Sequence, residues 1–355
     1  MAKIRAVTGD ISPAELGITL MHDHLLVDNN PWRTVMHPKD ERKRLLAEAP
    51  VTLQMRGEIS RDANLCADNN VLDSISDAAS EMLEYRMAGG RSLVDVTPIG
   101  IGRDHMSIAK ISKMSGLNVI CGTGWYADFS LPPWVREANS EQLSEMMRKE
   151  LTEGIEGTDI HAGLIGEIGC SYPWTDCERK VLEAAAIAQV RTGAPLTIHP
   201  GLHDLQNRRY VKQASEYLDF LQNKGVDFER VYVSHMDMTA DDTAYHRSII
   251  DKYGVVLGYD NFGNEMYYDT IYPGCGGIPD KMRVKGLVDL LGSGYEKHLV
   301  LSQDICLKIA LRKYGGYGYS HVLRHIVPEI LAGGVTQRQV DTMLVENPKR
   351  ILAWA

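Results

Sequence analysis

Residues 163–199 read GLIGEIGCSYPWTDCERKVLEAAAIAQVRTGAPLTIH and contain one complete strand–helix–strand pattern. The apolar runs Gly163–Glu167 and Pro195–His199 show no alternation with polar residues, which is typical of parallel strands buried on both faces. Between them, Thr175 is followed three residues later by a glutamate, the spacing of a capping box, and Gly193 is suited to end the helix. The stretch predicts a βαβ unit whose strands end in a carboxylate and an imidazole.

The same alternation of apolar runs and helical patterns continues along almost the whole chain. The six further candidate strands are Ile18–Met21, Ser92–Val96, Asn118–Cys121, Arg230–Ser234, Val255–Tyr259 and His298–Ser302. Eight strands that alternate with helices fit either an α/β barrel of the (β/α)8 type or a large doubly wound sheet. The final stretch, Thr336–Trp354, is predicted to be helical. A length of 355 residues suits a barrel with insertions, and no linker interrupts the pattern, so we expect one domain, residues 1–355.

Two connections are much longer than usual, at about residues 28–70 and 260–280. Both follow a strand, which in a barrel places them on the C-terminal, catalytic face. Aromatic residues in these and neighbouring loops form either the wall of a small-molecule pocket or ordinary loop anchors. They are Trp125, Tyr126, Phe262, Tyr267, Tyr268 and Tyr272.

The composition argues against several classes of partner. The formal net charge of −9 gives no reason to expect nucleic acid or an anionic membrane as a partner. The chain starts without the apolar segment of a signal peptide, and no later run approaches a membrane span. Its six cysteines are scattered without a CxxC pair, as expected of free thiols. We therefore expect a cytoplasmic protein that binds a small-molecule substrate.

Six side chains that can bind metal lie at or just beyond the ends of predicted strands. They are His22, His24, Glu167, His199, His235 and Asp304. Residues i and i+2 of a strand share a face, so the first two histidines can point at one metal. Barrel enzymes draw their catalytic residues from several strand ends on one face. Six ligands exceed the need of one tetrahedral zinc with an open position, but suit two cations that share a carboxylate and a water. Zn²⁺ fits imidazole and carboxylate best, and Mn²⁺, Co²⁺ or Ni²⁺ fit the same set.

The stretches that contain these residues resemble the phosphotriesterase family of the amidohydrolase superfamily, and within it the phosphotriesterase-related branch. The resemblance extends from about Ala6 to Pro348. It is carried by LGITLMHDH at 16–24, GLIGEIGCS at 163–171, IHPG at 198–201, Ser234–His235, Asp304 and residues 313–320. It implies a distorted (β/α)8 TIM barrel with long βα loops at the C-terminal face.

The resemblance also implies an arrangement of the metal ligands. His22, His24 and Asp304 would hold the more buried metal, and His199 and His235 the more exposed one. Glu167 would bridge the two, at a position where many members of the family have a carboxylated lysine. Asp304 would in addition be catalytic, taking a proton from the nucleophile and delivering it to the leaving group.

The implied activity is hydrolysis of a small ester, lactone or amide (an N-acyl compound) by a metal-bridging hydroxide, and the branch suggests an amide of an acidic amine. The alternatives are a non-catalytic small-molecule-binding barrel and a mononuclear amidohydrolase. A homodimer is implied by the resemblance alone. Lys308, Arg312 and Lys313 follow the last ligand closely. We hypothesise that one of them, Lys308 in particular, contacts an anionic group of the substrate; the other interpretation is a solvated surface.

Overall fold

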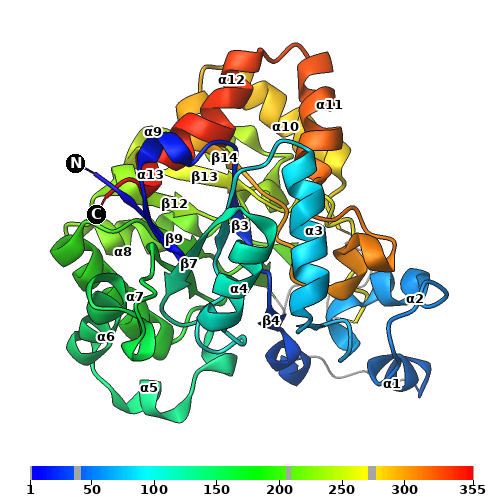
Figure 1. Cartoon of the computed structure of the whole chain (residues 1–355), viewed down its shortest axis with the longest axis horizontal. Coiled ribbons are helices and arrows are strands. Elements are labelled where there is room, and N and C mark those ends of the chain that lie inside the picture. Colours follow the sequence, from blue (N-terminus) through cyan, green and yellow to red (C-terminus); the bar gives the residue numbers. More distant parts are fainter. Residues whose placement is uncertain (1, 36–40, 205–208, 271–276, 355) are drawn as a thin grey trace.

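The computed structural model describes residues 2–35, 41–204, 209–270 and 277–354 (Figure 1). Its largest sheet has eight strands in the order β14-β13-β12-β9-β8-β7-β6-β3, and all neighbouring pairs are parallel. Their bounds are β3 (Thr19–Asp23), β6 (Ser92–Asp95), β7 (Asn118–Thr123), β8 (Leu164–Gly169), β9 (Leu196–His199), β12 (Val231–Val233), β13 (Val256–Tyr259) and β14 (Leu299–Leu301). Each overlaps one of the eight predicted strands.

The two outermost strands of this sheet approach each other and nearly close it. Just beyond β14, the backbone N–H of Asp304 donates to the carbonyl of His22 at 3.1 Å. The N–H of His24, just beyond β3, donates to the carbonyl of Ile305 at 3.2 Å. With helices in the connections between strands, this is the (β/α)8 barrel that the sequence resemblance implied; the doubly wound alternative is excluded.

The helices that connect the barrel strands lie on its outside (Figure 1). They are α3 (Ile75–Met87), α4 (His105–Ser115), α6 (Ser140–Thr152), α7 (Asp176–Thr192), α8 (Ala214–Gln222), α9 (Thr243–Tyr253) and α10 (Asp280–Gly292), and α11 (Val327–Ala332), α12 (Gln337–Asp341) and α13 (Asn347–Leu352) follow β14. The predicted ends of α7 are confirmed, because Thr175 and Glu178 form a capping box and Gly193 adopts a left-handed C-cap with φ 73°. Within the described residues, no helix is long and apolar enough to cross a membrane.

The stretch predicted as one final helix is interrupted by a π-helical turn. Residues Thr342–Glu346 form this turn between α12 and α13, and Pro348 follows in the first turn of α13. A proline ring clashes with the carbonyl four residues before it, so a local change to wider hydrogen bonding accommodates it. The same turn occurs at Val322–Ile326, ahead of a proline in α11.

The barrel interior is filled with apolar side chains beneath the strand ends. Alternate residues of each strand pack outward against the helices, and the others meet inside the barrel. The inner set comprises Met21, Val94, Val96, Ile120, Leu164, Tyr232, Val256 and Val300, and it packs with Ile4, Leu16, Ile351 and Leu352. The hairpin β1 (Ile4–Ala6) and β2 (Gly9–Ile11) contributes one of these residues. The interior is therefore a packed core that supports whatever lies at the strand ends.

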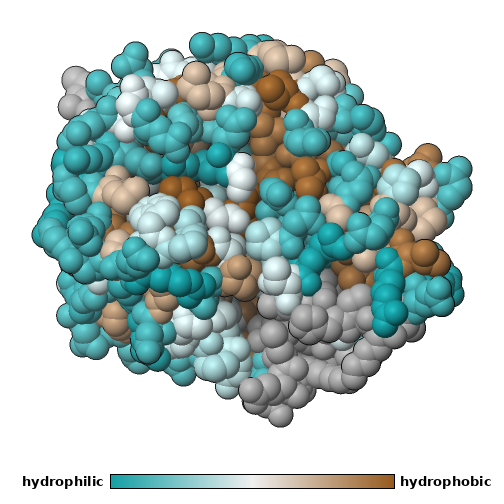
Figure 2. Space-filling model, turned by 90° about the horizontal axis from the view of Figure 1, so that it is seen from below, coloured by the Kyte–Doolittle hydropathy of each residue, from teal (hydrophilic) through white to brown (hydrophobic). Residues whose placement is uncertain are grey.

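Long connections carry extra structure beyond the barrel. The first contains α1 (Glu41–Ala47) and α2 (Arg56–Arg61), and its two ends form a short antiparallel pair, β4 (Val27–Asp28) with β5 (Val71–Leu72). In later connections, α5 (Pro133–Glu137) follows β7, and β10 (His203–Asp204) pairs with β11 (Arg209–Tyr210). Figure 1 shows α1 and α2 at one side of the barrel (lower right). Seen from below, the surface is largely hydrophilic, with hydrophobic residues exposed between the polar ones (Figure 2).

Candidate active site

The predicted site residues converge at the strand ends of the barrel. His22 belongs to two groups whose ligand atoms all lie within 4.8 Å of one another, one with Glu167 and His235 and the other with His24 and Asp304. The Nε2 atom of His24 lies 3.2 Å from Oδ1 of Asp304, and Nε2 of His22 lies 3.4 Å from Oε2 of Glu167. Five of the six residues predicted from sequence are thus gathered in two groups that share His22.

His199 lies beside these groups and belongs to neither. Its ring centroid is 4.6 Å from that of His235, and its Nε2 forms a hydrogen bond of 3.0 Å with the hydroxyl of Tyr126. All of the predicted residues except His22 line one cavity of about 80 Å³. Trp32 and Tyr268 contribute aromatic walls to the same cavity.

Irregular backbone geometry orients the side chains of the candidate site. The pairing of β3 with β6 shifts register between Leu20 and Asp23, and that of β8 with β9 shifts between Ile165 and Ile168. Both irregularities fall at site residues, where bulges commonly redirect a side chain. His235 and Asp304 have φ values of 59° and 48°.

That left-handed conformation is uncommon outside glycine. The described chain contains only three non-glycine residues of positive φ, and two of them are these predicted site residues. Strained backbone persists only where the surrounding structure enforces it, and it is concentrated at functional sites.

Hydrogen bonds hold three of the imidazoles through Nδ1. The Nδ1 atoms of His22 and His24 pair with the hydroxyls of Ser234 and Thr97 at 2.9 and 2.8 Å. That of His235 lies 2.9 Å from Oδ1 of Asp260. Such partners orient an imidazole and leave its Nε2 available. The Nε2 atoms of His22 and His24 accordingly face the carboxylates.

Asp260 is a site residue that the sequence prediction omitted. It is 1% exposed, accepts the backbone N–H of His235 at 2.8 Å, and places its Oδ2 3.7 Å from Nδ1 of His22. It directly follows β13, so the rule that found the other residues, a metal-capable group just beyond a strand, would also have found this one.

The carboxylates and imidazoles strongly perturb one another's pKa values. Burial, reinforced by repulsion from Asp304 and Asp260, raises the pKa of Glu167 to about 8. Burial alone would lower the pKa of His24, but its hydrogen bond to Asp304 and the charge of Glu167 raise it to about 9. Likewise, Asp260 overcomes the effect of burial and raises the pKa of His235 to about 10. A site without a cation therefore retains protons that a metal would displace.

The donor set fits bound metal. Among the atoms that the structure describes, His22 Nε2 and Glu167 Oε2 are buried without a hydrogen-bond partner. No lysine or arginine of the described chain forms an ion pair with Glu167 or Asp304. Buried carboxylates are normally paired or coordinate a metal, and orphaned polar atoms call for an unseen ion or water. Imidazole and carboxylate are suitable ligands for a divalent cation.

The basic residues that follow Asp304 do not reach this cavity. The ammonium of Lys308 pairs with Asp68 at 2.5 Å. Arg312 pairs with Glu84, and Lys313 pairs with Asp77 at 2.6 Å. None of the three lines the cavity that contains the site. The structure thus gives no support to the hypothesis that Lys308 contacts the substrate, because packing of the first long connection supplies it with a carboxylate partner.

The aromatic residues singled out from sequence divide between the two interpretations. Tyr126 and Tyr268 line the cavity, whereas Trp125 is buried in the core against Trp134. Tyr267 lies under the guanidinium of Arg61 at 3.9 Å, as a loop anchor. Phe262 lines an adjacent cavity, and Tyr272 lies outside the described residues.

Comparisons with known proteins agree with this architecture. The profile of the phosphotriesterase family matches residues 2–352. The N-acetyltaurine hydrolase of Tetraodon nigroviridis is 38% identical over 353 residues, which cover 99% of this chain and 98% of that protein.

Two solved structures show the same likeness. A resiniferatoxin-binding protein from Rhodobacter sphaeroides has a TM-score of 0.92 at 33% identity, covering 99% of this chain and 95% of its own. The phosphotriesterase homology protein from Escherichia coli, complexed with phosphate in its active site, has a TM-score of 0.77 at 29% identity, covering 95% and 99%. With a family profile that spans nearly the whole chain, the protein belongs to the phosphotriesterase family and is a hydrolase.

Proposed function

We propose that the protein is a binuclear metal-dependent hydrolase that cleaves the amide bond of N-acyl derivatives of acidic amines. The observation that carries the proposal is the convergence of His22, His24, Glu167, His235 and Asp304 within ligand distance, with His22 common to both groups. His199, 4.6 Å from the ring of His235, completes the six ligands. Two cations bound there would acidify a shared water and polarise the carbonyl of the substrate.

The choice of an amide rests on the relatives. The N-acetyltaurine hydrolases of Tetraodon nigroviridis and Homo sapiens are 38% and 34% identical to this chain over nearly its full length. N-acetyltaurine is an acetamide whose amine carries a sulfonate, so it is an amide of an acidic amine. Esters and lactones remain the second substrate class, to be separated from amides by assay.

The side chains of the protein have distinct roles in this proposal. Asp304 has 14% of its side chain exposed and lines the cavity, whereas Glu167 and the imidazole of His22 are almost fully buried. In the overall reaction, the oxygen of water bonds to the carbonyl carbon, the C–N bond breaks, and the leaving nitrogen takes a proton. Asp304 is placed to receive the proton of the water and deliver it to that nitrogen. Glu167 would bridge the two cations, since its two carboxylate oxygens lie 3.4 Å from Nε2 of His22 and 3.6 Å from Nε2 of His24.

Further assignments belong to the same proposal. Zn²⁺ is the metal that imidazole and carboxylate favour, with Mn²⁺, Co²⁺ or Ni²⁺ as substitutes. We propose that residues 1–355 act as one domain, in the cytoplasm, with a homodimer as the assembly to test. The five described cysteines (Cys66, Cys121, Cys170, Cys177 and Cys306) are free thiols, which accords with a reducing compartment.

The test is the metal content of protein purified without chelator, for the wild type and for Glu167→Ala. We expect about two metals per wild-type chain and the loss of at least one in the variant, because Glu167 belongs to one ligand group and lies 3.6 Å from His24 of the other. Glu346→Ala, which removes a largely exposed carboxylate, is the matched control and should retain both metals.

Other outcomes would replace the proposal. About one metal per chain, unaffected by the loss of Glu167, would favour the mononuclear amidohydrolase. No metal after reconstitution would favour the non-catalytic binding barrel. Once two metals are found, kcat/KM for N-acetyltaurine, compared with simple esters and lactones, decides the substrate class.

A further inference from the structure

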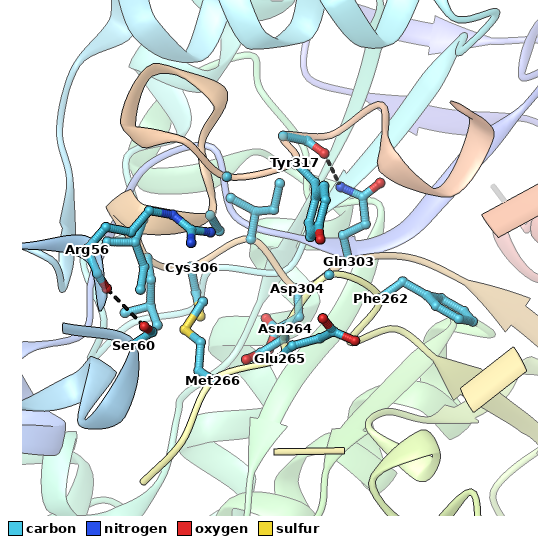
Figure 3. A pocket seen from close by; sticks show the side chains of 17 residues that line it. Arg56, Ser60, Phe262, Asn264, Glu265, Met266, Gln303, Asp304, Cys306 and Tyr317 are labelled. Carbon is cyan, nitrogen blue, oxygen red and sulfur yellow. Dashed lines mark hydrogen bonds between the residues drawn. The ribbon is translucent and has the colours of Figure 1, made fainter. Parts of the chain in front are cut away.

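A second cavity of about 160 Å³ adjoins the proposed metal centre (Figure 3). Asn264, Asp304, Cys306 and Leu307 line both cavities. A substrate whose reacting bond lies beside Asp304 therefore has space to extend into this second cavity. The side chains at the far side of this second cavity therefore influence which substrates fit.

Arg56 supplies the positive charge of this cavity. It belongs to α2, and among the described lining residues of the two cavities it is the only lysine or arginine. Figure 3 shows its guanidinium extending into the cavity from the side opposite Asn264 and Glu265. The Nε atom is buried and has no hydrogen-bond partner among the described atoms.

The lack of a carboxylate partner distinguishes Arg56 from the cations around it. Arg61, on the same helix, forms a bidentate pair with Asp269 at 2.8 and 2.9 Å. Lys308 is paired with Asp68. No ion pair of Arg56 occurs within the described residues, so its guanidinium retains donors for a ligand.

The local backbone makes room for this side chain. Gly315 has φ +82°, and a Cβ added to it would lie 3.3 Å from Cδ and 3.5 Å from Nε of Arg56. A larger residue at this turn would press on the guanidinium stem. The glycine thus leaves the arginine space at the edge of the cavity.

Several of the remaining polar groups of the cavity are already hydrogen-bonded or repel anions. The amide of Gln303 donates to the carbonyl of Gly318, and the hydroxyl of Ser60 donates to the carbonyl of Arg56. Glu265 is exposed and accepts the backbone N–H of Asp280. With Glu265 and Asp304 both acidic, Arg56 is the one side chain of the described lining whose charge attracts an anionic group.

We propose that Arg56 binds the anionic group, sulfonate or carboxylate, of the acidic amine whose acylated nitrogen lies at the metal centre. The proposal rests on the proposed function and names the residue that selects acidic substrates. A guanidinium presents two parallel N–H donors that match the oxygens of such a group. In N-acetyltaurine the sulfonate is separated from the amide nitrogen by two methylenes, so Arg56 would contact the substrate beside the reacting bond without acting on it, and its effect is on binding and selectivity.

The test compares a charged and a neutral amide in the metal-loaded enzyme. N-acetyltaurine is the charged substrate, and the methyl sulfone of the same length is the neutral one. We expect Arg56→Gln to lower kcat/KM for N-acetyltaurine about 10- to 100-fold, mostly through KM, and to change that for the sulfone less than about twofold. Arg56→Lys keeps the positive charge but lacks the two parallel N–H donors, so its kcat/KM for N-acetyltaurine should lie between those of the wild type and Arg56→Gln. Arg61→Gln removes an arginine of the same helix outside both cavities and should leave the ratio of the two substrates unchanged.

A calorimetric titration with ethanesulfonate separates this proposal from the proposed function. If the wild type hydrolyses neither amide, the proposed function fails. The role of Arg56 is then tested only by its effect on the binding of ethanesulfonate. Weaker binding of ethanesulfonate by Arg56→Gln, with an unchanged melting temperature, would support the subsite. Equal binding by wild type and variant, or an unchanged ratio of kcat/KM values, would overturn it even if amide hydrolysis is found.

Discussion

Protonation of the buried His246 is expected to destabilise the fold in mild acid. Its side chain is 0% exposed, and its Nε2 lies 2.9 Å from the hydroxyl of Thr239, which itself donates to the carbonyl of Met236. That hydroxyl can then only accept from Nε2–H. The Nδ1 atom, 2.9 Å from the hydroxyl of Tyr259, is left as an acceptor. These contacts fit the neutral imidazole, with one N–H donated and one ring nitrogen accepting.

The size of this loss of stability follows from the pKa of His246 in the folded and unfolded states. Burial lowers the pKa of His246 to about 4, whereas an unfolded histidine titrates near 6.5. Above pH 6.5 neither state binds the proton; as pH falls from 6.5 towards 4, only the unfolded chain binds it, so stability is lost over that range. At about 1.4 kcal/mol per pKa unit, the full difference is about 3 kcal/mol, of which about 2 kcal/mol is lost between pH 7 and pH 4.5.

The assay is urea unfolding of the wild type and His246→Gln at pH 7 and pH 4.5. Glutamine keeps one donor and one acceptor but does not titrate, so the variant should be less stable at pH 7 and lose about 2 kcal/mol less on acidification. The contributions of other titrating groups to the pH dependence are the same in both proteins and cancel in the comparison. The exposed His325→Gln is the control and should follow the wild type. A variant that loses as much stability as the wild type would refute the assignment of the acid sensitivity to His246.

Two further predictions concern the site. Asp260→Asn should weaken metal binding by about 10- to 100-fold in chelator competition, because the carboxylate accepts both the N–H and the Nδ1 proton of His235; unchanged affinity would show that Asp260 does not support the ligand. Lys308→Ala should change KM for N-acetyltaurine and for its neutral sulfone equally and by less than about twofold, since Lys308 is held by Asp68. A selective rise for the charged substrate would restore Lys308 as its partner.

Much of the fold was predictable because its signals are local. Eight unbroken apolar runs were sufficient to locate the barrel strands, and the capping residues of α7 marked its start and end. The π-helical turn before Pro348 was not predicted, because helical periodicity does not record a change of hydrogen bonding within one helix.

The candidate site was only partly predictable. Residue type and position at a strand end selected five residues that the structure brings together, and His199 beside them. The same rule applied to β13 would have added Asp260. The aromatic residues were less predictable, since Tyr126 lines the cavity while its neighbour Trp125 is buried in the core.

By itself, the sequence determined which groups stand at the ends of the strands, because burial and periodicity act over a few residues. Only the tertiary structure decided which distant groups meet. Lys308 follows Asp304 by four positions, yet its partner is Asp68, 240 residues away. Arg56 lies far from every predicted ligand in sequence, yet it shares a cavity with Asp304. Such pairings follow from how the barrel packs its long connections over the strand ends, and no local pattern encodes that packing.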